Sequence, residues 1–559
     1  MRRTVILAML ALLLIVGMTF GQTYERNETL FAGGGLWGPP TNWNPITPWS
    51  AMTGVVGLVY ETLYMYNPFE NELEPWLAVN GEWLDENTYQ LELREGIKWT
   101  DGEKFDADDV KFTFDIADKY PGVHYSTMWE WLKEVEKVDA YTLKFHFEEP
   151  LYHEWSYNLW QLPMIPEHIW SEKTEEEILS GANENPIGTG CYLTESHGQD
   201  RQIFIRNENW WATDQLGLKP GPKRIVYIAV NNNSVALGMI LKGELDISNF
   251  FLPGVPRLVQ AYPNMHTFYD EPPYMLSDNT AFLFLNTTRK PLDDPEFRKA
   301  LAFAINSDDI AERVFENQVL TSNSLGYLPI DAWMQYYDEE VVDKYGFSYD
   351  PPEARRILAK AGYKDINGDS FLEAPDGSEI KVSIIVPFGW TDWMESIKII
   401  ARNFNEIGIN AEPLFPDYGR YQDELYGGDF DMAINNFNSN ISNTVWTLYH
   451  WLFYPLRERM TSGNFGRYDN PEIEELLHEF NRTPMDKHEE AQEILSQVQE
   501  IFLKDMPSIP LWYNGMWFQA STDVWTNWPS EDGPVSYPTT WAGKWQLGGV
   551  YMLCDLEAK

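Results

Sequence analysis

The sequence predicts a mixed α/β protein of two lobes. Its 559 residues suffice for roughly two to four domains of about 100–200 residues each. Apolar residues make up 44% and charged residues 23%, as in ordinary globular proteins, which excludes a disordered or fibrous chain. Strand and helix patterns alternate in the second half, while the tail from Ile509 to Lys559 returns to the strand-and-turn pattern of the start. We therefore expect both ends of the chain in the same lobe.

The first half reads as strands alternating with short helices. Residues 88–93 alternate between polar and apolar side chains, which indicates a half-buried strand. Asp106, Asp108 and Asp109 open a helix, because the helix dipole favours negative charge in the first turn. The same patterns predict strands over 143–147, 202–206 and 224–230, and helices over 166–179 and 234–242.

The second half is richer in helices. Residues 281–285 form a short apolar run that predicts a fully buried strand. Two further strands are expected over 381–386 and 430–434. Helices are predicted over 295–305, 307–316, 352–361, 393–407, 471–479 and 487–504.

The chain is strongly acidic and rich in aromatic residues. Lys plus Arg total 41 against 85 Asp plus Glu, which gives a net charge of −44. Such a surface repels phosphate backbones and anionic lipid headgroups, so nucleic-acid binding and electrostatic membrane docking are not expected. Aromatic residues make up 15% of the chain and include 24 Trp, so flat apolar faces are expected at a surface as well as in the core.

The N-terminal residues predict export. Met1-Arg2-Arg3 precedes an apolar run over 5–20, and small residues at its end predict a secretory signal over 1–21 that is cleaved after Gly21. The alternative is a membrane anchor, but the run is shorter than the ~20 residues that span a bilayer. We expect a periplasmic or extracellular protein that is soluble and monomeric.

The chain has two cysteines, Cys191 and Cys554. Neither directly follows the N-terminal apolar run, so no lipid anchor is expected. An oxidising compartment permits a disulfide between them, but the sequence does not tell whether their Cα atoms come close enough.

The sequence contains no familiar catalytic motif. We find no phosphate-binding loop, no nucleophile elbow and no zinc-binding His-Glu-x-x-His helix. A pair of carboxylates of the glycosidase type is defined in space rather than in sequence, so a secreted glycosidase stays open as an alternative of a different class. No cofactor is required by any motif.

One loop resembles a calcium site. Oxygen-bearing residues alternate in the pattern of a calcium-binding loop, with a main-chain carbonyl expected from the seventh position. The residues are Asp365, Asn367, Asp369, Phe371, Glu373 and Asp376. Two features depart from an EF-hand, because the glycine falls at position four and position twelve is Asp. The loop is thus a candidate for a structural calcium ion, and the alternative is a solvated Asx-rich turn.

Six segments in order resemble the extracellular solute-binding proteins of ABC importers, in the branch for dipeptides, oligopeptides, nickel and oligosaccharides. The third carries a Gly-Glu-x-Asp turn at 243–246, and the second has Cys191 where the family usually has Pro. Together the segments span nearly the whole mature chain. They are residues 60–110, 185–192, 243–247, 286–305, 349–363 and 507–511.

The resemblance implies two α/β lobes joined by a hinge, with an extra subdomain inserted in the first lobe and an ABC permease as partner. Mapped onto this chain, lobe I comprises 22–65, 187–275 and 515–559, the inserted subdomain 66–186, and lobe II 276–514. The chain would cross between the lobes near 282–286 and 511–514. Closure of the lobes over a ligand would shift an equilibrium between open and closed forms.

The resemblance also bears on the ligand. Peptide-binding relatives usually present an acidic residue to the peptide amino terminus in a Gly-Trp-x-x-Asp stretch. The corresponding segment here, Asn436-Phe437-Asn438-Ser439-Asn440, has a neutral Asn440 at the acidic position. Because a buried ammonium without a counter-charge is costly, this departure argues against a peptide. Asn amides both donate and accept hydrogen bonds, which suits sugar hydroxyls.

The tryptophans favour a sugar as well, since a pyranose packs its C–H face on an aromatic ring. Trp390 and Trp393 follow a strand end at a helix start, and Trp512, Tyr513 and Asn514 are expected at the hinge. For any single Trp the alternative is core packing. Further candidates are Trp37, Trp43, Asn44, Trp49, Trp446 and Trp517.

From the sequence we expect an exported binding protein that captures a neutral oligosaccharide, a β-linked di- to short oligomer, and delivers it to a permease without cleaving it. An oligopeptide-binding protein is the alternative within the class. A sugar-sensing or chaperone-like role would share the same fold.

Overall fold

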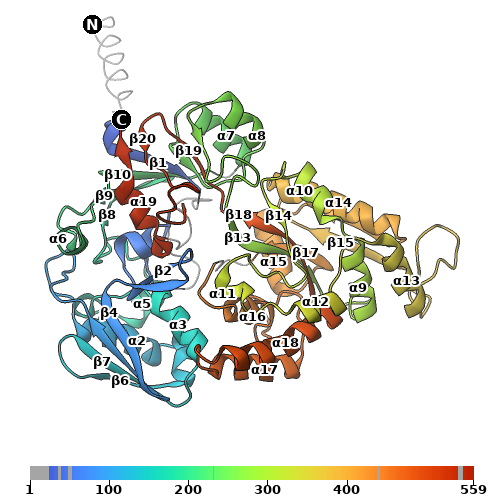
Figure 1. The fold of residues 1–559 in the computed structure, drawn as a ribbon, viewed down its shortest axis with the longest axis horizontal. Coiled ribbons are helices and arrows are strands. Elements are labelled where there is room, and N and C mark those ends of the chain that lie inside the picture. Colours follow the sequence, from blue (N-terminus) through green and yellow to red (C-terminus); the bar gives the residue numbers. More distant parts are fainter. Residues whose placement is uncertain (1–23, 35–39, 48–52, 231, 437–440, 539–544) are drawn as a thin grey trace, which may run out of the picture.

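The computed structural model describes residues 24–34, 40–47, 53–230, 232–436, 441–538 and 545–559. The predicted signal peptide over 1–21 lies outside the described residues. In the described part, two large mixed sheets and a smaller antiparallel sheet are surrounded by helices (Figure 1). The mixed α/β class expected from the sequence is confirmed.

The first large sheet brings the beginning, the middle and the end of the chain together. We call the body around this sheet lobe I. Its central strand is parallel to both neighbours, and the outer strands are antiparallel. The order is β12 (Met265–His266), β19 (Gln519–Ser521), β11 (Ile247–Ser248), β1 (Thr29–Gly33), β10 (Arg224–Ile228), β9 (Arg201–Arg206) and β8 (Tyr192–His197).

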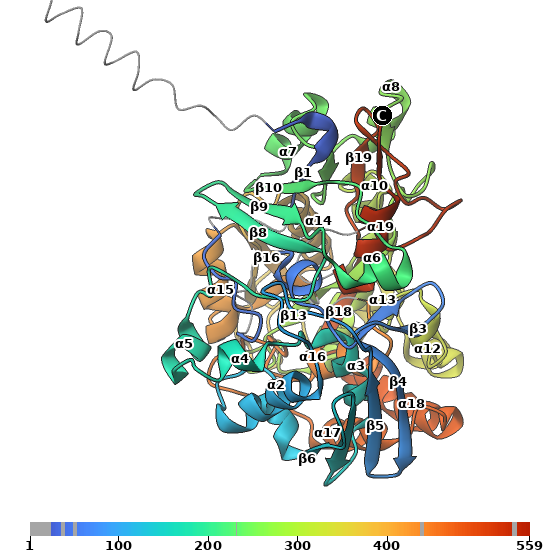
Figure 2. The same cartoon turned by 90° about the vertical axis from the view of Figure 1, so that its left-hand side faces the viewer.

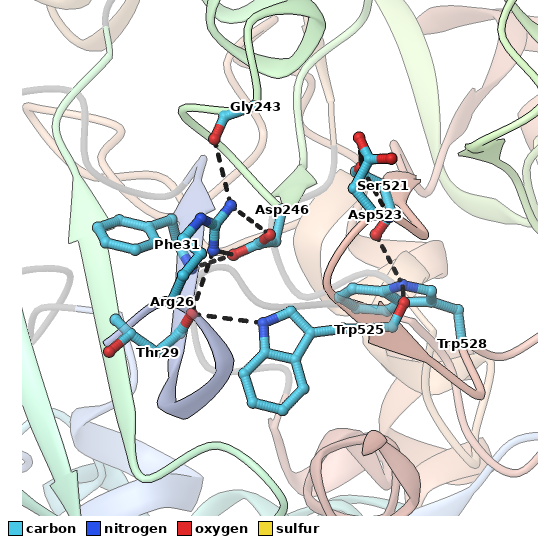
Figure 3. Close-up of polar contacts among 9 residues, drawn as sticks. All are labelled: Arg26, Thr29, Phe31, Gly243, Asp246, Ser521, Asp523, Trp525 and Trp528. Atoms are coloured by element: carbon cyan, nitrogen blue, oxygen red, sulfur yellow. Dashed lines mark hydrogen bonds and ion pairs between the residues drawn. The ribbon is translucent and has the colours of Figure 1, made fainter. Parts of the chain in front are cut away.

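An ion pair between the half-buried Arg26 and the buried Asp246 fastens the N-terminal segment to lobe I (Figure 3). Both terminal nitrogens of Arg26 lie 2.6 Å from the carboxylate of Asp246, which also accepts the main-chain N–H of Phe31 at 2.8 Å. The indole N–H of Trp525 donates to the carbonyl oxygen of Thr29 at 3.3 Å. Burial raises the pKa of Asp246, and the Arg26 guanidinium lowers it. The aspartate of the Gly-Glu-x-Asp turn is therefore part of the scaffold.

Short helices complete lobe I. The side chain of Asn232 accepts the main-chain N–H groups of Ser234 and Val235 and so caps the first turn of α7. The helices are α6 (Trp211–Leu216), α7 (Asn233–Leu241), α8 (Val255–Ala261) and α19 (Gly549–Asp555). Near the end of the chain, the short strands β20 (Trp525–Thr526) and β21 (Glu557–Ala558) pair with each other.

A four-stranded antiparallel sheet forms the core of a separate body, at the lower left of Figure 1, which we call the inserted subdomain. Helix α2 (Ala107–Lys119) packs on it and begins at a capping box in which Asp106 and Asp109 satisfy each other's main-chain N–H groups. The sheet order is β4 (Ala78–Asp85), β5 (Thr88–Leu93), β7 (Thr142–Phe147) and β6 (Leu132–Lys137). A hairpin of β2 (Tyr64–Asn67) and β3 (Glu72–Pro75) precedes it.

The helix predicted over 166–179 is wrong as a single element. The structure has α3 (Tyr152–Gln161), then the short α4 (Glu167–Trp170), and then α5 (Glu175–Ser180). Thr174 and Glu177 form a capping box at the start of α5. Because a capping residue has a non-helical backbone, Thr174 separates α5 from α4.

The second large sheet lies at the centre of what we call lobe II. Strand β13 pairs antiparallel with β17 on one side and with β18 on the other, and β15 is parallel to β16 and β17. The order is β14 (Leu320–Thr321), β18 (Ser508–Gly515), β13 (Ser277–Leu285), β17 (Met432–Asn436), β15 (Lys381–Ile385) and β16 (Asn410–Leu414). Residues 278–285 of β13 are all buried, as expected for the central strand.

Helices surround the sheet of lobe II (Figures 1 and 2). Capping residues fix many of their starts, for example Asp294 before α9 and Asp350 before α13, each followed by proline at the first turn. The helices are α9 (Pro295–Ala304), α10 (Ser307–Arg313), α11 (Asp331–Met334), α12 (Glu339–Tyr345), α13 (Pro351–Ala361), α14 (Thr391–Glu406), α15 (Tyr418–Gly427), α16 (Trp446–Leu452), α17 (Pro471–Arg482) and α18 (His488–Asp505).

The chain passes between the two large sheets at 267–276 and at 516–518. Ser277 of β13 lies opposite Gly515 of β18, so the two crossings are neighbours. The crossing predicted at 282–286 is wrong, because residues 282–285 lie deep in the sheet of lobe II. Trp512, Tyr513 and Asn514 also belong to that sheet and precede the second crossing.

Two further findings concern the chain as a whole. Cys191 and Cys554 are both free thiols in the structure, and burial raises the pKa of each. Among the described residues, no helix combines the length and the apolar character needed to cross a membrane.

Candidate functional site

A cavity of about 1410 Å³ lies between the two lobes. Its walls come from the segment after β11, from α3 and the loop before it, from the ends of β13, β17 and β18 in lobe II, and from α14 and α16. The volume exceeds the ~300–1,000 Å³ typical of sites for drug-sized ligands. The space therefore suits a ligand built of several units.

Aromatic rings at the start of α14 line the lobe II wall. Trp390 and Trp393 lie with ring centroids 4.8 Å apart and their planes at 73°. Tyr418, at the start of α15, stacks on Trp390 with centroids 5.9 Å apart and planes at 26°. Trp393 is 3% exposed and packs mainly into the core, whereas Trp390 is half-buried.

A second aromatic wall comes from α16. The rings of Trp446 and His450, one helical turn apart, stack at 4.5 Å and 22°, and both line the cavity. Tyr157 of α3 approaches Trp446 with centroids 6.4 Å apart. The helical spacing of four residues places both α16 rings on one face.

Lobe I contributes rings and an amide beside the second crossing. Phe251 and Trp517 meet edge to face at 5.3 Å, and both line the cavity. The side-chain N–H of Asn249 donates to the carbonyl oxygen of Trp517 at 2.7 Å. This bond connects the strand end of lobe I directly to the crossing segment.

Side-chain amides form a directed chain across the ends of the lobe II strands. Asn436 donates to the side-chain oxygen of Asn279 at 3.1 Å, and Asn279 donates to the carboxylate of Asp278 at 3.0 Å. The indole N–H of Trp512 donates to the side-chain oxygen of Asn514 at 2.9 Å, which fixes the orientation of that amide. Asp278, Asn279, Asn436 and Asn514 all line the cavity. Fixed amides of this kind can read the hydroxyl or amide groups of a ligand.

Two carboxyl groups in the cavity have raised pKa values. Burial raises the pKa of Asp392, in the first turn of α14, to about 6, although main-chain N–H groups and the side chain of Asn233 in lobe I act in the other direction. Burial likewise raises the pKa of Glu154, in α3, to about 7. A shifted pKa in a cavity marks a functional-site candidate.

The inserted subdomain touches lobe II directly beside the cavity. His153 and Thr444 share a hydrogen bond of 2.9 Å, and Trp160 donates to Asn443 at 3.0 Å. The side-chain N–H of Asn443 also donates to Ser156 at 2.6 Å. Helix α3 packs on α16 and α17 through these contacts (Figure 1). The lobes are therefore bridged by protein on this side.

The structure separates the predicted site residues into three groups. Trp390, Trp393, Asn436, Trp446, Asn514 and Trp517 line the cavity. Trp43, Asn44, Trp512 and Tyr513 are not among its lining residues. Trp37, Trp49, Phe437 and Asn440 lie outside the described residues.

The four residues away from the cavity are held in the protein interior. Trp43 is 1% exposed and packs on His197 with centroids 4.2 Å apart. Asn44 is fully buried and donates to the carbonyl oxygen of Ile178 at 2.7 Å. The hydroxyl of Tyr513 accepts the main-chain N–H of Asn323 at 3.0 Å. Trp512 reaches the cavity only indirectly, through its hydrogen bond to Asn514.

In the candidate calcium loop, the side chains accept hydrogen bonds from main-chain N–H groups of the same loop. Asp365 accepts the N–H groups of Gly368 and Ser370, and Glu373 accepts that of Ile366. Asn367 and Asp369 likewise accept loop N–H groups, and Phe371 donates one of them. Asp376 pairs with Lys290 at 3.3 Å. In the described part of the chain, no group of three or more His, Cys, Asp or Glu side chains is placed to hold a metal ion.

Sequence reasoning missed several residues of the cavity. Phe388 and Tyr418 follow the carboxyl ends of the neighbouring parallel strands β15 and β16, where α/β proteins commonly bind ligands, and that position was the available signal. Asn279 lies at the start of the buried strand β13, and the sequence offers no signal that this end faces a cavity. Other lining residues that were missed include Asn249, Phe250, Phe251, Asp278, Asp392 and His450.

The arrangement can hold a ligand between flat rings and fixed hydrogen-bonding groups. The rings come from both lobes, so a ligand in the cavity contacts both sides at once. Such differential contact favours the closed arrangement of the lobes. Fold and site together define a two-lobed solute-binding protein.

Comparison with known proteins agrees. The model of the bacterial extracellular solute-binding proteins, family 5 (middle), matches residues 72–455, and the chain belongs to this family. A di/tripeptide-binding protein 1 from Pseudomonas aeruginosa is 25% identical over 85% of this chain and 87% of its own. The family resemblance expected from the sequence, and the two-lobed periplasmic-binding-protein fold, are confirmed.

A crystal structure from Thermotoga maritima, of the periplasmic oligopeptide-binding protein of an oligopeptide ABC transporter, is 52% identical. It covers 96% of this chain and 100% of its own, with a TM-score of 0.93. A mannohexaose-bound structure of that protein matches with the same identity and coverage and a TM-score of 0.91. The chain is thus a substrate-binding component of an ABC importer, which binds a small-molecule ligand and works with an ABC permease.

Proposed function

We propose that this protein captures a neutral oligosaccharide, a β-linked di- to short oligomer, in the interlobe cavity and delivers it to the permease without cleaving it. One observation carries the proposal. Aromatic rings and side-chain amides from both lobes converge on one large cavity, among them Trp390, Trp446, Trp517, Asn279 and Asn436. Sugars present apolar C–H faces for rings and hydroxyls for amides, so this lining suits them.

The size of the cavity and the Thermotoga maritima neighbour support the proposal. A cavity of about 1410 Å³ has room for several sugar units. The 52% identical neighbour was crystallised with mannohexaose. Binding of a neutral ligand also avoids the cost of burying an unpaired charge.

A thermal-shift screen, followed by calorimetric titration, tests the proposal. We expect β-1,4-linked manno- or cello-oligosaccharides to raise the unfolding midpoint by mass action, and di- to pentapeptides to leave it unchanged. A midpoint raised by peptides and not by any sugar would overturn the proposal.

A second candidate is an oligopeptide, as the names of many relatives indicate for those proteins. The observation in its favour is that Asp278 and Asp392 line the cavity, since either carboxylate can pair with the ammonium of a peptide amino terminus. If a peptide is the ligand, replacing by Asn whichever of Asp278 and Asp392 pairs with its amino terminus should abolish peptide binding, whereas for a sugar the same replacement should only weaken binding, because the neutral amide retains a hydrogen bond.

Family members are solute-binding proteins, and we propose binding without bond cleavage. A secreted glycosidase would release reducing ends from β-1,4-mannohexaose during overnight incubation. We expect the reducing-end count to stay at that of the buffer control.

We also propose that the chain is exported by the segment over 1–21, carries no lipid anchor and acts as a monomer. N-terminal sequencing of the protein secreted from an expressing cell should begin at Gln22. Light scattering should give the mass of one chain.

A further inference from the structure

Two exposed aromatic rings of the cavity come from neighbouring loops of lobe II. Phe388 is 69% exposed and Tyr418 is 49% exposed, and both line the cavity. Apolar rings left in water are costly unless something covers them during function. Their position on the cavity wall means that a ligand, rather than a partner protein, is placed to cover them.

Exposure decreases in steps from these rings toward the interior. Trp390 is half-buried and contacts the rings of both Tyr418 and Trp393, and Trp393 is 3% exposed. Rings of decreasing exposure therefore lead from the rim into the wall. We call Phe388, Trp390 and Tyr418 the aromatic shelf.

The parallel pairing of β15 and β16 brings the shelf together. Ile385 and Leu414, the last residues of the two strands, are partners in the register, so the chain leaves both strands side by side. Phe388 then donates its main-chain N–H to the carbonyl oxygen of Pro416 at 2.8 Å. This bond fixes the loop that carries Phe388 to the loop that leads into Tyr418.

Local contacts hold the rings in place before any ligand binds. Gly389 has a φ of +94°, a left-handed conformation that glycine adopts without strain, and it turns the chain between Phe388 and Trp390. Gln422, one turn into α15, donates to the hydroxyl of Tyr418 at 3.1 Å. A rigid surface loses little entropy when a ligand covers it.

We propose that the aromatic shelf is an outer subsite that binds the sugar units at one end of a longer oligosaccharide. The inference rests on the proposed function. Short oligomers fill the inner part of the cavity between Trp446, Trp517 and the strand-end amides, and only longer ones reach the shelf. The shelf therefore sets how affinity rises with chain length.

The test is calorimetric titration of β-1,4-linked manno-oligosaccharides of two to six units. The variants are Phe388→Ala and Tyr418→Ala, with Tyr418→Phe to retain the ring. Tyr349→Ala is the matched control, because Tyr349 is 44% exposed in lobe II and does not line the cavity. The unfolding midpoint of each free variant reports whether the fold is intact.

We expect each alanine variant to bind mannohexaose about 3- to 10-fold more weakly, as for the loss of one stacked ring. Binding of mannobiose should change less than about 2-fold, and Tyr418→Phe and Tyr349→Ala should match the parent protein at every length. An equal loss of affinity at all oligosaccharide lengths, or no loss at any length, would contradict the role of the aromatic shelf as an outer subsite while leaving the proposed function intact. If the parent protein binds none of the oligosaccharides, the proposed function fails and the shelf fails with it.

Discussion

The indole N–H of Trp160 donates a hydrogen bond to the side-chain oxygen of Asn443 at 3.0 Å, and this bond joins the inserted subdomain to lobe II. Asn443 is 7% exposed and donates in turn to Ser156 on the same face of α3. Because the contact involves no ligand, it holds the inserted subdomain against lobe II in the free protein as well. We therefore expect part of the free energy of closure to come from the protein itself.

Replacement of Asn443 by Ala should weaken this contact. We expect the radius of gyration of the free protein, measured by small-angle X-ray scattering, to increase as the open form gains population. The affinity for mannohexaose should fall about 10-fold, since one buried and one half-buried hydrogen bond between the inserted subdomain and lobe II are lost. Asn264→Ala is the control, because that side chain bonds to Asp523 within lobe I. An unchanged radius of gyration would show that the contact does not hold the lobes together.

The carboxylate of Glu61 organises three tryptophans in the interior. It is 2% exposed and accepts the indole N–H groups of Trp76, Trp210 and Trp211 at 3.0, 3.0 and 2.8 Å. Burial raises its pKa, while the three indole donors lower it.

The variant Glu61→Leu would leave three buried N–H groups without an acceptor. We expect the free energy of unfolding, measured with urea, to fall by about 3–5 kcal/mol. Glu176→Leu, at an exposed carboxylate of α5, should change it by less than about 0.5 kcal/mol. Equal stabilities of the two variants would contradict the structural role of Glu61.

Calcium binding by the loop over 365–376 stays a prediction. If the ion binds, calorimetric titration of the chelated protein should show uptake at one site, and Asp369→Asn should weaken it. The internal hydrogen bonds of Asp365 and Glu373 favour the alternative, a turn stabilised by its own main chain. A titration without heat or midpoint change would establish that alternative.

Local patterns predicted most elements because local physics forms them. The strand over 88–93 coincides with β5, and the acidic start at Asp106 caps α2 as expected. The run over 281–285 is a buried strand, but its place in the sheet relative to the crossings depends on pairing with β17 and β18. Non-local pairing of this kind leaves no mark on a short stretch of sequence.

The same limit applies to the candidate site. Trp390 and Trp512 are the same residue type at comparable positions near strand ends, yet Trp390 lines the cavity and Trp512 packs on Phe315 with centroids 5.0 Å apart. Which face of a strand or loop a ring occupies is set by register and by the packing of the two lobes. The preference for rings and amides could be predicted from the sequence, whereas their positions could not.

Asp392 provides a test of pH dependence. It is 8% exposed in the wall of the cavity, and burial raises its pKa to about 6. An ordinary Asp in the unfolded chain titrates near about 4. The folded protein therefore binds this proton more tightly, so the stability contributed by this group is greatest at low pH and is lost as the pH rises from about 4 through 6.

The neutral variant Asp392→Asn should remove that dependence. We expect urea unfolding to show the variant equal to the parent protein at pH 4 and more stable by about 2–3 kcal/mol at pH 8, with the difference developing between about pH 4 and 6. A carboxylate that costs stability in a ligand cavity is typical of a group retained for function. The affinity for mannohexaose should accordingly fall in the variant even as its stability rises, because a charged acceptor of a hydroxyl hydrogen bond becomes a neutral one. A variant that is less stable than the parent protein at pH 8 would show that the carboxylate is a structural acceptor for the start of α14 instead.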